Sequence, residues 1–134
     1  MTSEAAPRVS IIVVTYGTGT VVLDMLDAVA QHTPIAHEVI VVDCLPPDAA
    51  TRTSLLLADR DDVGLHAVDD NLGFAGGNEF GVEQSRGDYL CFLNPDVIVG
   101  HGWLEPLMAA LDDPAVGIAA PVFLNGDGSL QEAG

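Results

Sequence analysis

The chain has 134 residues, of which 49% are apolar and 18% are charged. This composition excludes a disordered chain, and the length suits one domain with a buried core. Twenty acidic residues against four arginines and no lysine give a net charge of −16, which argues against a nucleic-acid-binding surface. With so few cations, a bound diphosphate would need a divalent metal ion, a helix N-terminus and backbone N–H groups.

Apolar, β-branched runs alternate along the chain with stretches of helical periodicity. The predicted strands cover residues 9–16, 37–43, 63–68, 88–94 and 117–124, and the predicted helices cover about 21–32, 48–60, 75–86 and 103–111. The strands are apolar at successive positions, which is typical of strands buried on both faces of a parallel sheet. The sequence therefore predicts an α/β fold of three layers, with helices on both faces of a mainly parallel sheet.

The two cysteines, Cys44 and Cys91, lack the close spacing of a zinc site or a redox pair, so we expect two buried thiols in a reducing compartment. The N-terminal residues do not resemble a signal peptide, and no apolar run approaches the roughly 18 residues of a membrane span. These features predict a cytoplasmic protein, with peripheral association with the inner face of the membrane as the alternative location.

Candidate ligand-binding residues stand where predicted strands end. Thr15, Tyr16 and Gly17 close the first strand, Asp43 ends the second, and Asn94-Pro95-Asp96 ends the strand that begins near residue 88. In open parallel sheets, ligands bind beyond the carboxyl ends of the strands. We therefore expect these three groups of residues to converge, provided that the sheet is parallel.

The two aspartates suggest different roles. Asp43 is predicted either to accept a hydrogen bond from a base or a ribose hydroxyl, or to cap a turn. Asp96 follows a strongly apolar strand and a proline, which favours a ligand of Mg²⁺ or Mn²⁺ that uses one carboxylate oxygen, with diphosphate and water completing the octahedron. The alternative for Asp96 is an ordinary turn aspartate. The four histidines have no metal-ligand spacing.

A glycine-rich segment, which includes Asn71, Gly73, Gly76 and Asn78, opens the third predicted helix. Glycines let the backbone approach a ligand closely, and a helix N-terminus favours anions. The segment is not a Walker loop, because no Gly-Lys-Ser/Thr follows it. It predicts an anion-binding turn, with a flexible connection between strand and helix as the alternative.

From Val9 to about Gly134, these motifs resemble the nucleotide-binding N-terminal part of family 2 glycosyltransferases, which have the GT-A fold. They are similar to those of rhamnosyltransferase-like members. The resemblance implies that Ser10 to Tyr16 line the nucleotide pocket and that Asp43 contacts the base. It further implies that Asn71 and Gly73 form the N-x-G turn. Asp96 matches the metal-ligating aspartate, and Asn94 stands where many relatives carry an earlier aspartate. The glycine loop, with Gly76 and Asn78, completes the implied nucleotide-sugar site.

The resemblance implies inverting transfer of a sugar from a UDP- or dTDP-sugar to a glycan or lipid-linked acceptor in polysaccharide biosynthesis, assisted by Mg²⁺ or Mn²⁺. It also predicts a single domain over residues 1–134 that lacks the acceptor-binding half and its general base. Such a chain would bind the donor weakly and transfer no sugar alone. The sequence departs from the family at Cys44-Leu45-Pro46-Pro47 and at Glu79, where relatives carry asparagine.

Two other functions remain open at this point. Gly17-Thr18-Gly19 and Asp43 have the approximate spacing of a dinucleotide-binding fingerprint, but Val22 occupies the place of its third glycine. A non-catalytic remnant of a glycosyltransferase, or an interaction module, would explain both the missing half and Glu79.

Overall fold

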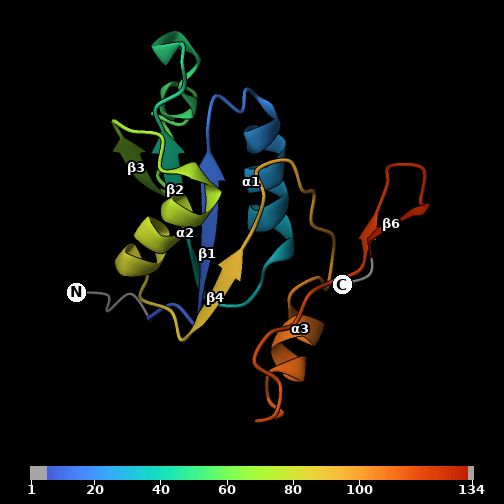
Figure 1. Ribbon diagram of the computed structural model, residues 1–134. Helices are drawn as coiled ribbons and strands as arrows, with labels where there is room; N and C mark the ends of the chain where they lie inside the picture. Colours follow the sequence, from blue (N-terminus) through green and yellow to red (C-terminus); the bar gives the residue numbers. More distant parts are fainter. Residues whose placement is uncertain (1–5, 133–134) are drawn as a thin grey trace. The chain divides into compact units, whose positions relative to one another are not determined.

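The computed structural model describes residues 6–132, and the chain divides into two compact units, Met1–Val99 and Gly100–Gly134 (Figure 1). Residues 1–5 and 133–134 of the single domain predicted over the whole chain lie outside the described part. That single domain stays a prediction. No helix in the described residues is long and apolar enough to cross a membrane.

The first unit is built on a sheet of four parallel strands in the order β3-β2-β1-β4. The strands are β1 (Val9–Thr15), β2 (His37–Cys44), β3 (Gly64–Val68) and β4 (Tyr89–Phe92). The register pairs Thr15 with Asp43 and Asp43 with Ala67, so the strands end at the same edge of the sheet. The parallel sheet expected from the sequence is confirmed.

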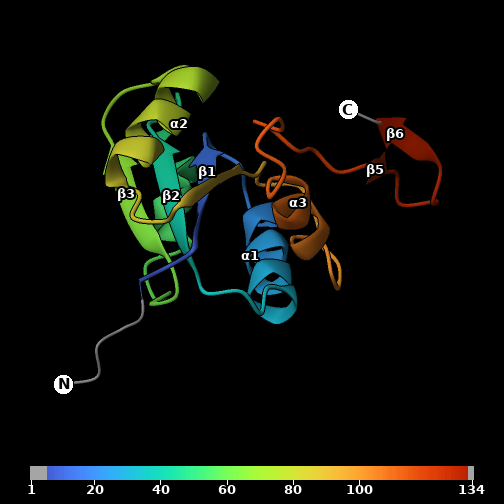
Figure 2. The same cartoon turned by 90° about the horizontal axis from the view of Figure 1, so that it is seen from below.

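Two helices cover opposite faces of this sheet, α1 (Val21–His32) and α2 (Gly73–Gln84), as Figures 1 and 2 show. Helix α1 buries Val22, Met25, Leu26 and Val29, which share one helical face because of their spacing. Helix α2 lies unusually close to the sheet through Gly77 and Gly81. A Cβ atom at Gly77 would lie 2.6 Å from Val14 Cγ1. The three-layer α/β arrangement expected from the sequence is confirmed.

The helix predicted over residues 48–60 is wrong. The structure has two short 3₁₀ helices instead, η1 (Ala49–Thr51) and η2 (Thr53–Leu55), with Arg52 between them in an extended conformation at φ −56° and ψ 131°. Two prolines, Pro46 and Pro47, precede this segment, and Asp48 caps η1 by accepting a hydrogen bond from the Ala50 N–H. The side chain of Arg52 is committed to distant partners, which local helical periodicity cannot reveal.

The outer strands also differ from expectation, because β3 and β4 are not buried on both faces. Strand β4 is shorter than the predicted 88–94, and its side chains alternate between partly buried and exposed. Cys44 is buried in β2, but Cys91 in β4 is only partly buried, so the prediction of two buried thiols is wrong for Cys91. Strands at the edge of a sheet have fewer neighbours, and their apolar sequence cannot show this.

The second unit contains α3 (Glu105–Ala110) and a small antiparallel pair, β5 (Phe123–Leu124) and β6 (Leu130–Glu132). The predicted helix near 103–111 is confirmed in a shorter form. The predicted strand 117–124 is wrong over most of its length, since only its last two residues pair in the sheet. Pro121 interrupts the run, and proline has no N–H to donate to a ladder.

Candidate functional site

The carboxyl ends of the strands bring the predicted residues of the first unit to one edge of the sheet. Strands β2 and β4 flank β1 on either side, so the strand order reverses at β1. Such a switch point is where ligands bind in open α/β sheets. Tyr16 and Gly17 follow β1, Asp43 lies at the end of β2, Asn71 and Gly73 follow β3, and Asn94 and Asp96 follow β4.

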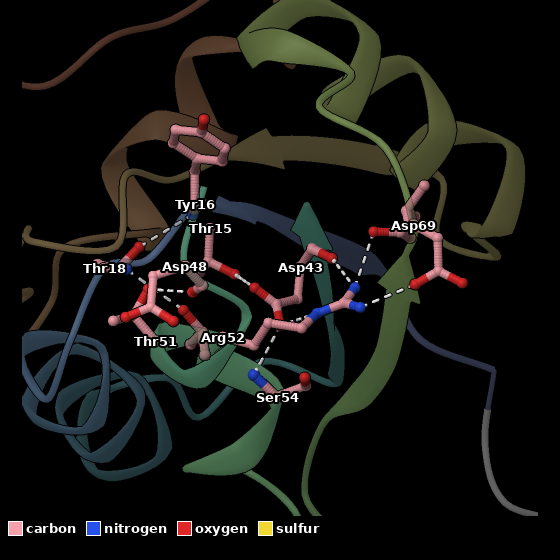
Figure 3. Close-up of polar contacts among 11 residues, drawn as sticks. Thr15, Tyr16, Thr18, Asp43, Asp48, Thr51, Arg52, Ser54 and Asp69 are labelled. Carbon is pink, nitrogen blue, oxygen red and sulfur yellow. Dashed lines mark hydrogen bonds and ion pairs between the residues drawn. The ribbon is translucent and has the colours of Figure 1, made fainter. Parts of the chain in front are cut away.

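The carboxylate of Asp43 is fully buried and satisfied within the protein (Figure 3). The Thr15 hydroxyl donates to its Oδ1 at 2.8 Å, and the backbone N–H of Ser54 donates to its Oδ2 at 2.7 Å. The Nε atom of Arg52 lies 3.6 Å from the same Oδ2. Thr15 and Asp43, which were predicted to converge, are therefore joined by a hydrogen bond. Through Ser54, Asp43 also holds the segment that follows β2.

Arg52 joins the ends of β2 and β3, and sequence reasoning missed it. Its guanidinium donates to Asp69 Oδ1 at 2.8 Å, to the Val68 carbonyl at 2.7 Å and to the Asp43 carbonyl at 3.1 Å (Figure 3). The hydrogen bond with Asp69, and the nearby charge of Asp43, raise the pKa of Arg52 above its usual range. The available signal was the scarcity of cations, since a rare arginine among many acids commonly has an acidic partner.

The turn after β1 is shaped by glycine. Gly17 has φ +60°, and a Cβ there would lie 3.3 Å from Pro46 Cβ and from Thr51 Oγ1, so a larger residue would be strained. The Tyr16 N–H donates to Thr18 Oγ1 at 3.2 Å, while the Tyr16 side chain is 45% exposed. The turn therefore presents an aromatic ring beyond the carboxyl end of β1.

The turn after β3 leads directly into α2. The Asn71 side chain accepts a hydrogen bond from the Gly73 N–H at 3.1 Å, and Gly73 has φ +67°. The first N–H groups of a helix have no partner within the helix, so the N-terminus of α2 offers donors to an anion. Gly76 is partly buried on this first turn. The Asn78 side chain is buried and donates to the Phe74 carbonyl at 3.0 Å, so it is engaged within α2.

A hollow of about 210 Å³ lies between these two turns. It is lined by Val14, Tyr16, Cys44, Asn71, Gly73 and Phe74. Three of the predicted residues, Tyr16, Asn71 and Gly73, are thus brought together. Phe74 and Cys44 were not predicted as ligand contacts, because apolar residues in the sequence cannot be distinguished from core residues.

The turn after β4 carries Asn94 and Asp96, and both residues are exposed. The Asn94 carbonyl accepts a hydrogen bond from the Val97 N–H at 3.3 Å. Within residues 6–132, no three His, Cys, Asp or Glu side chains gather closely enough to hold a metal ion. One exposed carboxylate still suits Mg²⁺, which is often bound by one or two carboxylates together with substrate phosphates and water.

Comparison with solved structures shows the same fold in TarS from S. aureus. One TarS structure matches with a TM-score of 0.64 and 22% sequence identity. The match covers 79% of this chain and 20% of the TarS chain. A structure of TarS 1-349 in complex with UDP-GlcNAc matches with a TM-score of 0.63 and 21% sequence identity. This match covers 79% of this chain and 31% of the TarS chain. Another structure of TarS 1-349 was solved in complex with UDP.

Two sequence relatives align with most of this chain. An uncharacterized protein, y4gI of Sinorhizobium fredii, is 28% identical over 98% of this chain and 15% of its own length. Polypeptide N-acetylgalactosaminyltransferase 3 of Drosophila melanogaster is 29% identical over 90% of this chain and 19% of its own length. The chain thus spans less than a fifth of each of these relatives. The model of glycosyl transferase family 2 matches residues 10–133, and the chain therefore belongs to that family.

Proposed function

We propose that this chain provides the donor-binding part of a glycosyltransferase that uses a nucleotide-diphosphate sugar. The observation that carries the proposal is the convergence of Tyr16, Asn71 and Gly73 around one hollow at the carboxyl edge of a family 2 domain. The family membership disfavours the dinucleotide-binding alternative. A non-catalytic remnant of the same family is an outcome that the experiment below distinguishes.

The geometry supports a division of the site into two parts. The hollow beside Tyr16 has a size and an apolar lining that suit a nucleobase, while the N-terminus of α2 favours the negative charge of a diphosphate. Asp96, which is exposed beyond β4, would hold Mg²⁺ or Mn²⁺ by one carboxylate oxygen. When bound, the metal would neutralise charge on the nucleoside diphosphate leaving group.

The finer chemistry belongs to the same proposal. The reaction is inverting transfer to a hydroxyl of a glycan or lipid-linked acceptor, with a UDP- or dTDP-sugar as donor. The proposed location is cytoplasmic, with peripheral association with the inner face of the membrane as the alternative. A base must deprotonate the acceptor hydroxyl, and we assign no residue of this chain to that task. We therefore expect donor binding from these residues and no sugar transfer by this chain alone.

The test is isothermal titration of UDP, dTDP and GDP into the purified chain, with Mn²⁺ and then with EDTA, repeated on Asp96→Ala. We expect EDTA and Asp96→Ala each to weaken binding at least about tenfold, because a diphosphate and an acidic chain repel without the metal. Asp59→Ala, at another exposed aspartate, is the control and should bind like the wild type.

A different experimental result would contradict each part of the proposal. Binding that is unchanged by EDTA and by Asp96→Ala would remove the metal site but leave nucleotide binding in place. No binding of any nucleotide, with a folded chain, would support the non-catalytic remnant. Robust sugar transfer by this chain alone would contradict the expectation that these residues bind the donor without transferring its sugar.

A further inference from the structure

Three of the four arginines lie at the amino ends of the strands, away from the candidate donor site. Arg8 precedes β1, Arg60 precedes β3 and Arg86 precedes β4. Arg52 is the exception, since it follows β2, and the chain has no lysine. Among the described residues, Arg52 is therefore the arginine whose position lets it influence the carboxyl edge of the sheet.

The guanidinium of Arg52 is engaged within the protein. It donates to Asp69 Oδ1 at 2.8 Å and to the Val68 carbonyl at 2.7 Å, both at the end of β3. It also donates to the Asp43 carbonyl at 3.1 Å, at the end of β2. Figure 3 shows the guanidinium between Asp43 and Asp69, and the Arg52 side chain is only 14% exposed. Arg52 therefore acts on the carboxyl edge through the backbone that it holds.

A series of hydrogen bonds leads from the end of β3 that Arg52 holds to the start of α2. The Asp70 carbonyl accepts a hydrogen bond from the Leu45 N–H at 3.1 Å, and Asp70 Oδ1 accepts one from the Asn71 N–H at 2.8 Å. The Asn71 side chain accepts one from the Gly73 N–H at 3.1 Å, where α2 begins. The conformation of the turn after β3 thus depends on where Arg52 holds the end of this strand.

On the basis of the proposed function, we propose that Arg52 is a positioning residue for donor binding. It does not touch the donor, but it fixes the turn that contains Asn71 and Gly73, two of the residues that line the hollow. With this turn it also fixes the N-terminus of α2, which favours the negative charge of a diphosphate. Donor affinity then depends on the geometry of the hydrogen bonds of Arg52 and not on its positive charge.

The first variant, Arg52→Lys, separates position from charge in a titration of UDP with Mn²⁺. Lysine keeps the charge, but its ammonium group cannot bond several acceptors in the geometry of the guanidinium. We expect UDP binding to weaken about tenfold, the lower end of the loss found for residues that orient metal ligands.

Glu38→Gln is the matched control, because it disturbs a polar connection at the opposite, amino edge of the same sheet. It should destabilise the chain but change UDP affinity by less than about twofold, since distant sites act independently. Circular dichroism is used to confirm that each variant is folded at the temperature of the titration.

The second variant, Asp69→Ala, gives effects of opposite sign for position and for charge. The Asp69 side chain is 91% exposed and bonds Arg52, so we expect its removal to leave the chain folded and the end of β3 less firmly held. If charge alone mattered, the loss of an acidic group near a diphosphate would tighten UDP binding. We expect weaker binding instead. Asp59→Ala, at another exposed aspartate, should bind UDP like the wild type.

The outcomes separate this inference from the proposed function. If the wild type binds UDP with Mn²⁺ and Arg52→Lys binds it equally well, the positioning role is wrong while donor binding stands. Equal losses of affinity in Arg52→Lys and Glu38→Gln, or unchanged or tighter binding by Asp69→Ala, would also overturn the inference. If Arg52→Lys does not fold, the sign of the Asp69→Ala effect decides. Absence of nucleotide binding in the wild type overturns both proposals.

Discussion

Arg52 holds the carboxyl ends of β2 and β3 and the segment between them in one arrangement. Its guanidinium is mostly buried, bonds two backbone carbonyls and Asp69, and lies beside the buried charge of Asp43. Its Nε atom is buried without a hydrogen bond, although Asp43 Oδ2 is 3.6 Å away. A planar guanidinium can serve several acceptors at once, and a lysine ammonium cannot reproduce that geometry.

Replacing Arg52 should destabilise the first unit strongly. We expect Arg52→Ala to lower the free energy of unfolding by about 3 kcal/mol, because it leaves Asp43 as a buried charge without its cation. Arg52→Lys should recover part of this loss. Urea denaturation at neutral pH measures the effect, and Arg60→Lys, within more exposed ion pairs, should cost less than about 1 kcal/mol. Equal effects of Arg52→Ala and Arg60→Lys would contradict this role.

Glu38 forms a second polar connection, near the amino ends of the strands. Its Oε1 accepts hydrogen bonds from the Ser10 hydroxyl at 2.6 Å and from the Arg86 N–H at 2.7 Å, and its Oε2 accepts from Arg86 Nε at 3.0 Å. Burial alone would raise the pKa of Glu38, but these hydrogen bonds and the charge of Arg86 outweigh it and lower the pKa. The carboxylate thus ties β1 and β2 to the turn before β4.

This lowered pKa predicts a pH-dependent contribution to stability. Because the folded-state pKa of Glu38 lies below its unfolded value, the stabilisation is fully present above the unfolded pKa, about 4.5. It is lost as the pH falls through the folded-state pKa. Glu38→Gln should therefore cost about 1–3 kcal/mol at pH 7 and progressively less in acid. Urea denaturation across this range measures it, with exposed Glu83→Gln as the control, and a pH-independent difference would contradict it.

At the scale of elements, α2 approaches the sheet closely because it carries glycine where the two surfaces meet. Gly77 lies against Val14, and Gly81 lies against Ile12, with no room for a Cβ atom at either position. Glycine lowers helix propensity, so the close contact is kept at a local cost. The short distance places the first turn of α2, with Phe74, beside the hollow.

A single methyl group on α2 should reveal this contact. Gly81→Ala should destabilise the fold by about 1–3 kcal/mol, because the added Cβ meets Ile12 in a packed interface. Gly76→Ala lies in the same helix and would meet only Leu72 Cβ, at 3.3 Å. It should be neutral or slightly stabilising, because alanine favours helix. Thermal unfolding of the two variants measures the difference, and a Gly81→Ala variant as stable as Gly76→Ala would exclude the tight contact.

At the scale of the whole molecule, the chain consists of two compact units, and the candidate donor site belongs to the first. All four strands of the first unit are parallel, so Asp43 at the end of β2 and the turns that carry Tyr16, Asn71 and Asp96 lie at the same edge of the sheet. Among the described residues, those that line the hollow all belong to the first unit. Substitutions in the first unit, made in the full chain, therefore test nucleotide binding.

The alternation of strands and helices, the parallel sheet and the helical layers on both faces were predictable from residue order. Each depends on local periodicity, since runs such as residues 9–16 and 37–43 are apolar at successive positions and 21–32 has one apolar helical face. The family motifs around Asn71 and Asp96 are also contiguous in sequence. Such features can be recognised in the sequence without knowledge of any distant contact.

The roles of Asp43, Arg52 and Phe74 depended on tertiary structure. Asp43 and Thr15 are 28 residues apart, and Arg52 and Asp69 are 17 residues apart, so their bonds exist only once the strands pair. In place of the helix predicted over 48–60 there are two short 3₁₀ helices, and the Arg52 side chain between them bonds carbonyls at the ends of β2 and β3. The exposure of Phe74 and of the edge strands likewise depends on which elements pack against one another in the tertiary structure. The local sequence does not determine this packing.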